Sequence, residues 1–177
     1  RVPLPISLPN LKPANIAFCL LNRHYVRPEL RDAIIEVSSR LGEKFPESEV
    51  RYLDANFPFM NKFPLLPHLS HHDGKKLDLA FLYKDSEGQP TNSLPSVSGY
   101  GVFDEPEDSE GNTCRMCKQK GYWQYDYSKY FTFGSWGAHQ VDAERTAFLV
   151  RLLAERVDIG KLFIEPHLKQ RWGVNYG

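Results

Sequence analysis

The chain has 177 residues, and its 22 Lys and Arg balance 22 Asp and Glu, so the formal net charge is zero at pH 7. With 41% hydrophobic and 13% aromatic residues, it can build the core of a single domain. The sequence has no long run of one charge sign, so nothing in it indicates a nucleic-acid partner. Its longest apolar stretches are far shorter than the ~20 residues that span a bilayer.

Residues 1–26 begin with the proline-rich segment RVPLPISLPNLKP. Each proline fixes its own φ and restricts the residue before it, so we expect these residues to form an extended N-terminal arm over a surface. The chain starts at Arg1 without a methionine or a recognisable leader peptide, which is typical of a processed or trimmed product. Residues 27–177 are expected to form a single domain.

Two long helices are predicted because apolar residues recur at helical spacing. The first starts near Arg27, where Pro28 and Glu29 suit a first turn, and continues through RPELRDAIIEVSSRLGEKF. The second covers residues 142–157, DAERTAFLVRLLAERV. Pro166 predicts the start of a further, shorter helix.

Short strands are predicted in four β-prone or apolar segments, residues 49–53, 76–83, 97–103 and 161–165. Few helices and short strands indicate an α+β fold, with a small antiparallel sheet flanked by two or three helices.

The loop before the second of these strands holds three of the six histidines, His68, His71 and His72, within five residues. Asp78 follows His71 after six intervening residues. Zinc binds imidazole nitrogen and carboxylate oxygen among non-sulfur ligands, and a catalytic site uses three protein ligands and leaves one position for water. Because Gly74 lets the chain turn back, His71 and Asp78 are predicted to supply two of these ligands.

The spacing of these residues alone does not distinguish a metal site from a structural role. A histidine pair in a polar loop is often a capping or hydrogen-bonding group. A carboxylate at position 78, in an otherwise apolar segment, favours a metal site because a buried carboxylate needs a cation, a metal or several donors. A bound zinc ion lowers the pKa of its water toward roughly 7, which would generate a hydroxide able to attack an amide carbonyl.

The three cysteines, Cys19, Cys114 and Cys117, are too few for a disulfide scaffold. Cys114 and Cys117 form a CRMC pair, which is half of a structural zinc site, but only Cys19 remains to extend it. We therefore expect a disulfide, either within this chain or to a cysteine beyond it, as in an exported protein, rather than a zinc ribbon or a redox motif. The aromatic stretch Tyr122–Trp136 is expected to be mostly core, and one or two of its members, with Tyr100, are candidates to line a substrate groove.

The segment PLLPHLSHHDGKKLDLAF resembles the zinc motif of penicillin-insensitive murein endopeptidases, with Leu66 in place of the first of two prolines. RYLDANFPF resembles the strand and loop that lead into that motif, and TAFLVRLLAERVDIGKLFIEPHLKQRWG resembles a later helix and strand of the family. These enzymes belong to the LAS group of zinc metallopeptidases, which includes lysostaphin-like and D-Ala-D-Ala peptidases. The resemblance covers roughly residues 27–83 and 146–173, and it implies a LAS-peptidase-like fold.

The resemblance also implies roles for individual residues. His71 and Asp78 would be zinc ligands, and His68 would bind substrate or assist the developing oxyanion. The family's third ligand lies in a C-terminal His-x-His that this sequence lacks, so we expect the ligand strand to lie beyond the end of this chain. Within the chain, His167 is the substitute candidate for the third ligand and Glu165 for the catalytic base, although a surface or capping role for His167 is the alternative.

Together these patterns predict a zinc-dependent peptidase or amidase that hydrolyses peptide cross-links of peptidoglycan, in the periplasm or otherwise exported. Two alternatives stay open: an inactive LAS-like binding domain, and a zinc hydrolase of another amide substrate. The oligomeric state is not indicated by the sequence.

Overall fold

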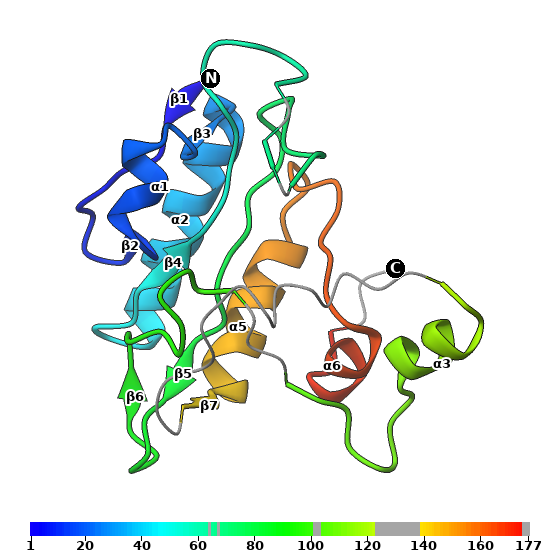
Figure 1. Cartoon of the computed structure of the whole chain (residues 1–177). Helices are drawn as coiled ribbons and strands as arrows, with labels where there is room; N and C mark the ends of the chain where they lie inside the picture. The colour runs from blue at the N-terminus through cyan, green and yellow to red at the C-terminus, as the bar shows by residue number, and fades with distance from the viewer. Residues whose placement is uncertain (64, 67, 101–103, 123–138, 175–177) are drawn as a thin grey trace.

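The computed structural model describes residues 1–63, 65–66, 68–100, 104–122 and 139–174 (Figure 1). These residues form a mixed α+β structure with five helices and three small sheets. The helices are α1 (Ile16–Leu20), α2 (Pro28–Lys44), α3 (Thr113–Gln119), α5 (Ala143–Ala154) and α6 (Pro166–Arg171). The strands are β1 (Val2–Pro3), β2 (Leu11–Pro13), β3 (Tyr25–Val26), β4 (Val50–Tyr52), β5 (Tyr83–Lys84), β6 (Pro90–Thr91) and β7 (Gln140–Val141).

Helices α2 and α5 pack against each other and confirm the two long helices predicted from the sequence. α2 has proline in its first turn and ends with Lys44 in its last turn, where a cation is favourable. α5 is capped by Asp142, whose side chain accepts a hydrogen bond from the Arg145 backbone N–H at 3.1 Å. The main core contains the buried face of α2, Leu149, Leu152 and Leu153 of α5, and residues of the neighbouring strands.

The prediction that residues 1–26 form an extended surface arm is wrong. β1 pairs antiparallel with β3, β2 pairs parallel with β4, and α1 lies between these strands in sequence. Leu4 and Leu11 are at most 1% exposed and belong to the same core as α2. Pro3 and Pro13 lie in short strands, whereas Pro9 lies in a turn. Leu4 and Leu11 pack in the core with residues far along the chain, and burial of apolar surface holds the segment in the fold.

The strands form three separate sheets, so the prediction of one small antiparallel sheet is corrected. The β2–β4 pair is parallel, and the β6–β5–β7 sheet is antiparallel. Residues 49–53 contain β4 as predicted, whereas the predicted strand 76–83 contributes only Tyr83 to β5. Residues 161–165 form no strand. The sequence predicted a buried strand here, but the segment lies at the surface, and Phe163 is 88% exposed.

Of the other predicted elements, α6 begins at Pro166 as expected. Leu168 of α6 packs in a second core with Trp172 and with residues of α5. Residues 97–100 contain no strand, and the rest of the predicted strand 97–103 lies outside the described residues. Most of the aromatic stretch Tyr122–Trp136 lies outside them too. Within the described part of the chain, no helix is long and apolar enough to cross a membrane.

Candidate metal centre

The chain that follows β4 forms one side of a candidate metal centre, because it pairs with the residues around Asp78. The backbone N–H of Ala80 donates to the Arg51 carbonyl at 2.9 Å, and that of Leu53 donates to the Asp78 carbonyl at 2.8 Å. The Asp78 N–H in turn donates to the Asp54 carbonyl at 2.9 Å. Asp78 is therefore held on a paired segment, which fixes where its carboxylate points.

His71 is buried beside this segment and is 4% exposed. Its Nδ1 lies 2.8 Å from the carbonyl oxygen of Ala55, and its Nε2 lies 3.3 Å from Asp78 Oδ1. A carbonyl only accepts hydrogen bonds, so Nδ1 carries a proton. When Nε2 releases its own proton, the lone pair on Nε2 becomes available to a metal. This arrangement orients Nε2 as a metal ligand beside the carboxylate.

His68 reaches the same carboxylate from the turn that precedes His71. The turn is closed by the His71 N–H, which donates to the His68 carbonyl at 2.9 Å. His68 Nδ1 lies 3.2 Å from Asp78 Oδ2, and Nε2 lies 3.6 Å from Asp54 Oδ2. The side chain is 26% exposed, so one face of the cluster is open to solvent.

The ligand atoms of His68, His71 and Asp78 all lie within 4.8 Å of one another, and no other such group occurs in the described part of the chain. Two imidazoles and one carboxylate form the ligand set of known catalytic zinc sites, in which a fourth position is left for water or substrate. The group can therefore hold a metal ion, although nitrogen and oxygen ligands of this kind accept several divalent metals.

Three further side chains surround this group. The Arg23 guanidinium binds both carboxylate oxygens of Asp54, with Nη2 to Oδ2 at 2.7 Å, and Asp54 is only 2% exposed. The Tyr100 hydroxyl donates to Asp78 Oδ2 at 2.7 Å. The same hydroxyl accepts from the Asp54 backbone N–H at 3.2 Å. The sequence did not single out Arg23 or Asp54, and it suggested Tyr100 only as a groove-lining residue.

Burial and charge shift the pKa values of the three candidate ligands in different directions. Burial lowers the pKa of His68, although the charges of Asp78 and Asp54 oppose this effect. Burial also disfavours the charged form of His71, but the hydrogen bond and charge of Asp78 outweigh it and raise the pKa. Burial acts to raise the pKa of Asp78, but the interactions with His71, Tyr100 and His68 together outweigh burial and lower the pKa. Asp78 is therefore ionised at neutral pH, as a metal ligand must be.

The histidine loop has little regular structure, and Arg1 joins it to the N-terminal residues. The Arg1 guanidinium donates to the carbonyl oxygens of Phe57, Met60 and His72, the last two at 3.0 and 2.7 Å, and to Asn61 Oδ1 at 2.6 Å. Backbone carbonyls that no strand or helix partner reaches are thereby satisfied. The segment expected to be a surface arm thus helps to hold the loop that carries the candidate ligands.

His167 and Glu165 do not join the candidate metal centre. His167 is 5% exposed, and its Nε2 lies 2.8 Å from the Asp104 carbonyl oxygen, which requires a proton on that nitrogen. Its Nδ1 lies 4.0 Å from Glu165 Oε2. Neither residue belongs to the group formed by His68, His71 and Asp78. The third member of that group is His68, not His167.

The CRMC pair lies in α3. Cys19, Cys114 and Cys117 are all free, so no disulfide forms within this chain. Cys19 is buried in the main core, whereas Cys114 is exposed and its Sγ lies 3.9 Å from Glu165 Oε1. The pair contributes nothing to the candidate metal centre.

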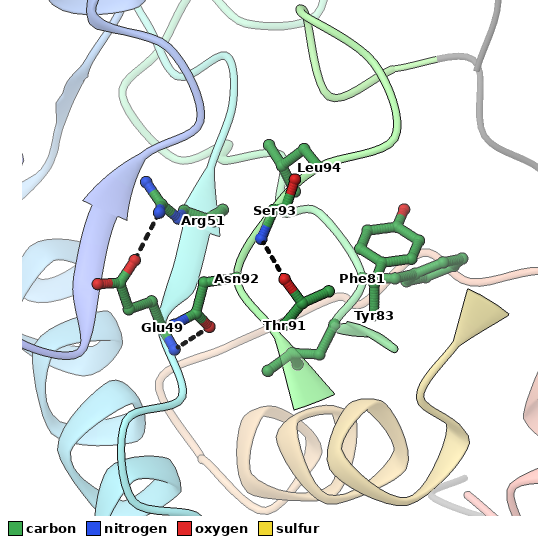
Figure 2. A pocket seen from close by; sticks show the side chains of 9 residues that line it. Glu49, Arg51, Phe81, Tyr83, Thr91, Asn92, Ser93 and Leu94 are labelled. Carbon is green, nitrogen blue, oxygen red and sulfur yellow. Dashed lines mark hydrogen bonds and ion pairs between the residues drawn. The ribbon is translucent and has the colours of Figure 1, made fainter. Parts of the chain in front are cut away.

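A small hollow between the β4 segment and the chain around β6 is separate from the metal centre (Figure 2). Several of its polar groups are bonded to one another. The Glu49 N–H donates to Asn92 Oδ1 at 3.0 Å, and Arg51 Nη2 pairs with Glu49 Oε2 at 2.6 Å. The Ser93 N–H donates to Thr91 Oγ1 at 3.1 Å. Arg51 Nε is buried in the lining without a hydrogen-bond partner.

Comparison with protein families, with curated protein sequences and with solved structures finds no match to this chain. A function for the site is therefore inferred from its own chemistry and from the motif resemblance in the sequence.

Proposed function

We propose that this chain is a zinc-dependent hydrolase of amide bonds, and that its substrates are the peptide cross-links of cell-wall peptidoglycan. One observation supports the proposal above all others: His68, His71 and Asp78 present two nitrogens and one oxygen within 4.8 Å of one another. This is the donor set of a catalytic zinc site. The substrate class, a LAS-peptidase-like fold and an exported or periplasmic location are supported by the resemblance to murein endopeptidases.

In this proposal, each candidate ligand has a defined task. His71 offers Nε2 while its other ring nitrogen is held by the Ala55 carbonyl, and Asp78 supplies the negative charge. A zinc ion held by these residues would supply Lewis-acid polarisation of an amide carbonyl and a water molecule of lowered pKa. His68, at the solvent-facing side, either completes the ligand set or contacts the substrate carbonyl.

The first experiment measures metal content. Purified chain equilibrated with zinc is expected to hold one zinc ion per chain by elemental analysis, and His71→Ala is expected to lose it. His72→Ala is the matched control, because His72 lies in the same loop but outside the candidate ligand group. Absence of stoichiometric zinc in the unmodified chain would rule out the zinc hydrolase.

The second experiment measures turnover and separates the roles of His68. Zinc-loaded chain is incubated with purified murein, and the released muropeptides are quantified with and without a chelator. If His68→Ala loses zinc, His68 is a ligand; if it keeps zinc and loses turnover, His68 acts on the substrate. Stoichiometric zinc without cleavage of murein would instead support the binding domain, or, if a simple amide is hydrolysed, a different substrate class.

A further inference from the structure

We infer that Tyr100 is a positioning residue of the candidate metal centre: its hydroxyl holds one oxygen of Asp78 and so leaves the other oxygen for the metal. The inference rests on the proposed function, since it assigns a role within the same site. Tyr100 lies 22 residues after Asp78 in sequence, yet its hydroxyl donates to Asp78 Oδ2 at 2.7 Å. It also accepts from the Asp54 backbone N–H at 3.2 Å, so both of its hydrogen-bonding functions are used.

The two oxygens of the Asp78 carboxylate have different surroundings. Oδ1 lies 3.3 Å from His71 Nε2, the nitrogen whose lone pair is available to a metal. Oδ2 accepts from the Tyr100 hydroxyl and lies 3.2 Å from His68 Nδ1. A carboxylate that is hydrogen-bonded at one oxygen tends to bind a metal through the other, and partners of this kind orient ligands in metal sites. Tyr100 therefore directs Asp78 to bind through Oδ1 alone.

Tyr100 is itself fixed by a short loop packed on the chain after β4. Ser96 Oγ donates to the Tyr100 carbonyl at 2.7 Å. Gly99 has a φ of +76°, and a Cβ there would lie 2.4 Å from Leu53 Cδ2, so the loop can approach this closely only with glycine. The Tyr100 ring lies 5.0 Å from the His68 ring between centroids. The hydroxyl is thus held in place before a metal binds, as a positioning group requires.

The test is the variant Tyr100→Phe, which keeps the ring and its contact with His68 and removes only the hydroxyl. Zinc affinity, measured by competition with a chromophoric chelator, is expected to fall about 10- to 100-fold. The visible spectrum of the Co²⁺-substituted chain is expected to change as well, because an unrestrained Asp78 can bind with both oxygens. These readouts report the metal centre and do not depend on turnover.

Tyr52→Phe is the matched control. Tyr52 is also a buried tyrosine, and its hydroxyl donates to the Pro5 carbonyl at 3.0 Å and contacts Cys19 Sγ at 3.5 Å, away from the candidate ligands. Loss of the Tyr52 hydroxyl is expected to lower the thermal stability of the metal-free chain without changing the zinc affinity or the Co²⁺ spectrum.

Two results would overturn the inference while leaving the proposed function intact. One is an unmodified chain that binds zinc together with a Tyr100→Phe variant of equal affinity and unchanged Co²⁺ spectrum. The other is an equal loss of affinity in Tyr100→Phe and Tyr52→Phe, which would assign a general structural role to both hydroxyls. Failure of the unmodified chain to bind zinc would instead remove the proposed function, and the inference with it.

Discussion

Two clusters of polar side chains each combine an arginine, histidine and carboxylates but differ in what remains available for a ligand. The metal-centre cluster consists of Arg23, Asp54, His68, His71, Asp78 and Tyr100. The α6 cluster consists of Asp104, Glu110, Glu165, His167 and Arg171. In the first, the arginine binds Asp54 and leaves Asp78 to the two imidazoles. In the second, Arg171 pairs with both Asp104 and Glu110 at 2.9 and 2.5 Å.

The histidines of the two clusters show the same difference. His71 and His167 each place one ring nitrogen 2.8 Å from a backbone carbonyl oxygen. The other nitrogen of His71 lies 3.3 Å from a carboxylate that no arginine pairs with, whereas that of His167 lies 4.0 Å from the half-exposed Glu165. Residue type alone does not make a metal ligand. The donors must also be left unpaired by the rest of the fold and must converge on one point.

The largest effect is expected when the carboxylate nearest the histidine is neutralised, which is Asp78 in the metal-centre cluster and Glu165 in the α6 cluster. Asp78→Asn is expected to weaken zinc binding more than about 100-fold, because loss of a ligand exceeds the effect of losing an outer partner. Glu165→Gln is the matched control and is expected to leave zinc affinity unchanged. Isothermal titration calorimetry of the two variants measures both effects. Equal affinities would place the metal elsewhere.

The buried ion pair of the metal-centre cluster predicts a large effect on stability. Arg23→Met leaves the Asp54 carboxylate buried without its cation, and removal of one partner of such a pair costs about 3 kcal/mol or more. Arg31→Met, at the more exposed Arg31–Asp32 pair, is expected to cost less than about 1 kcal/mol. Urea unfolding of the metal-free variants gives both values. A similar loss for the two would mean that the Asp54 pair is effectively solvated.

For the α6 cluster, the comparison predicts that His167 contributes to stability and not to metal binding. His167→Leu leaves the Asp104 carbonyl without its donor and is expected to lower the free energy of unfolding by about 1 to 3 kcal/mol. Zinc affinity should remain that of the unmodified chain. A variant that stays folded but loses zinc would restore His167 as the third ligand predicted from the sequence.

Much of the helical structure could be predicted because it depends on local periodicity. The apolar spacing in α2 and α5 and the proline at the start of α6 are signals within a single segment. The role of residues 1–26 could not be predicted in this way. Whether Leu4 and Leu11 are exposed depends on pairing with strands β3 and β4, and strand pairing between distant segments has no local pattern.

The residues of the candidate site also differ in whether a local sequence pattern predicts them. His71 and Asp78 were predicted from one short segment, and the structure places them 3.3 Å apart. Asp54 and Tyr100 lie 24 residues before and 22 residues after Asp78, and Arg23 is further away still. Their convergence depends on the pairing of Leu53 and Asp54 with Asp78 and on the loop at Gly99, so no spacing rule could find them.

The smallest effect is expected at the surface of the α6 cluster, where Arg171 forms two hydrogen bonds to Glu110. These bonds lower the pKa of Glu110 from its ordinary 4.5 to about 2. The ionised form is favoured in the folded state, so its contribution to stability is fully present above pH 4.5 and is lost as the pH falls toward 2.

Glu110→Gln should therefore change thermal stability only slightly at neutral pH, because the Arg171 and Glu110 side chains are partly exposed and solvent screens the pair. Between pH 4.5 and 2, the variant should lose stability less steeply than the unmodified chain, and thermal unfolding at a series of pH values measures the two slopes. Parallel curves would mean that Arg171 does not hold Glu110 in solution. The α6 cluster would then have unpaired carboxylates, and its contrast with the metal-centre cluster would rest on His167 alone.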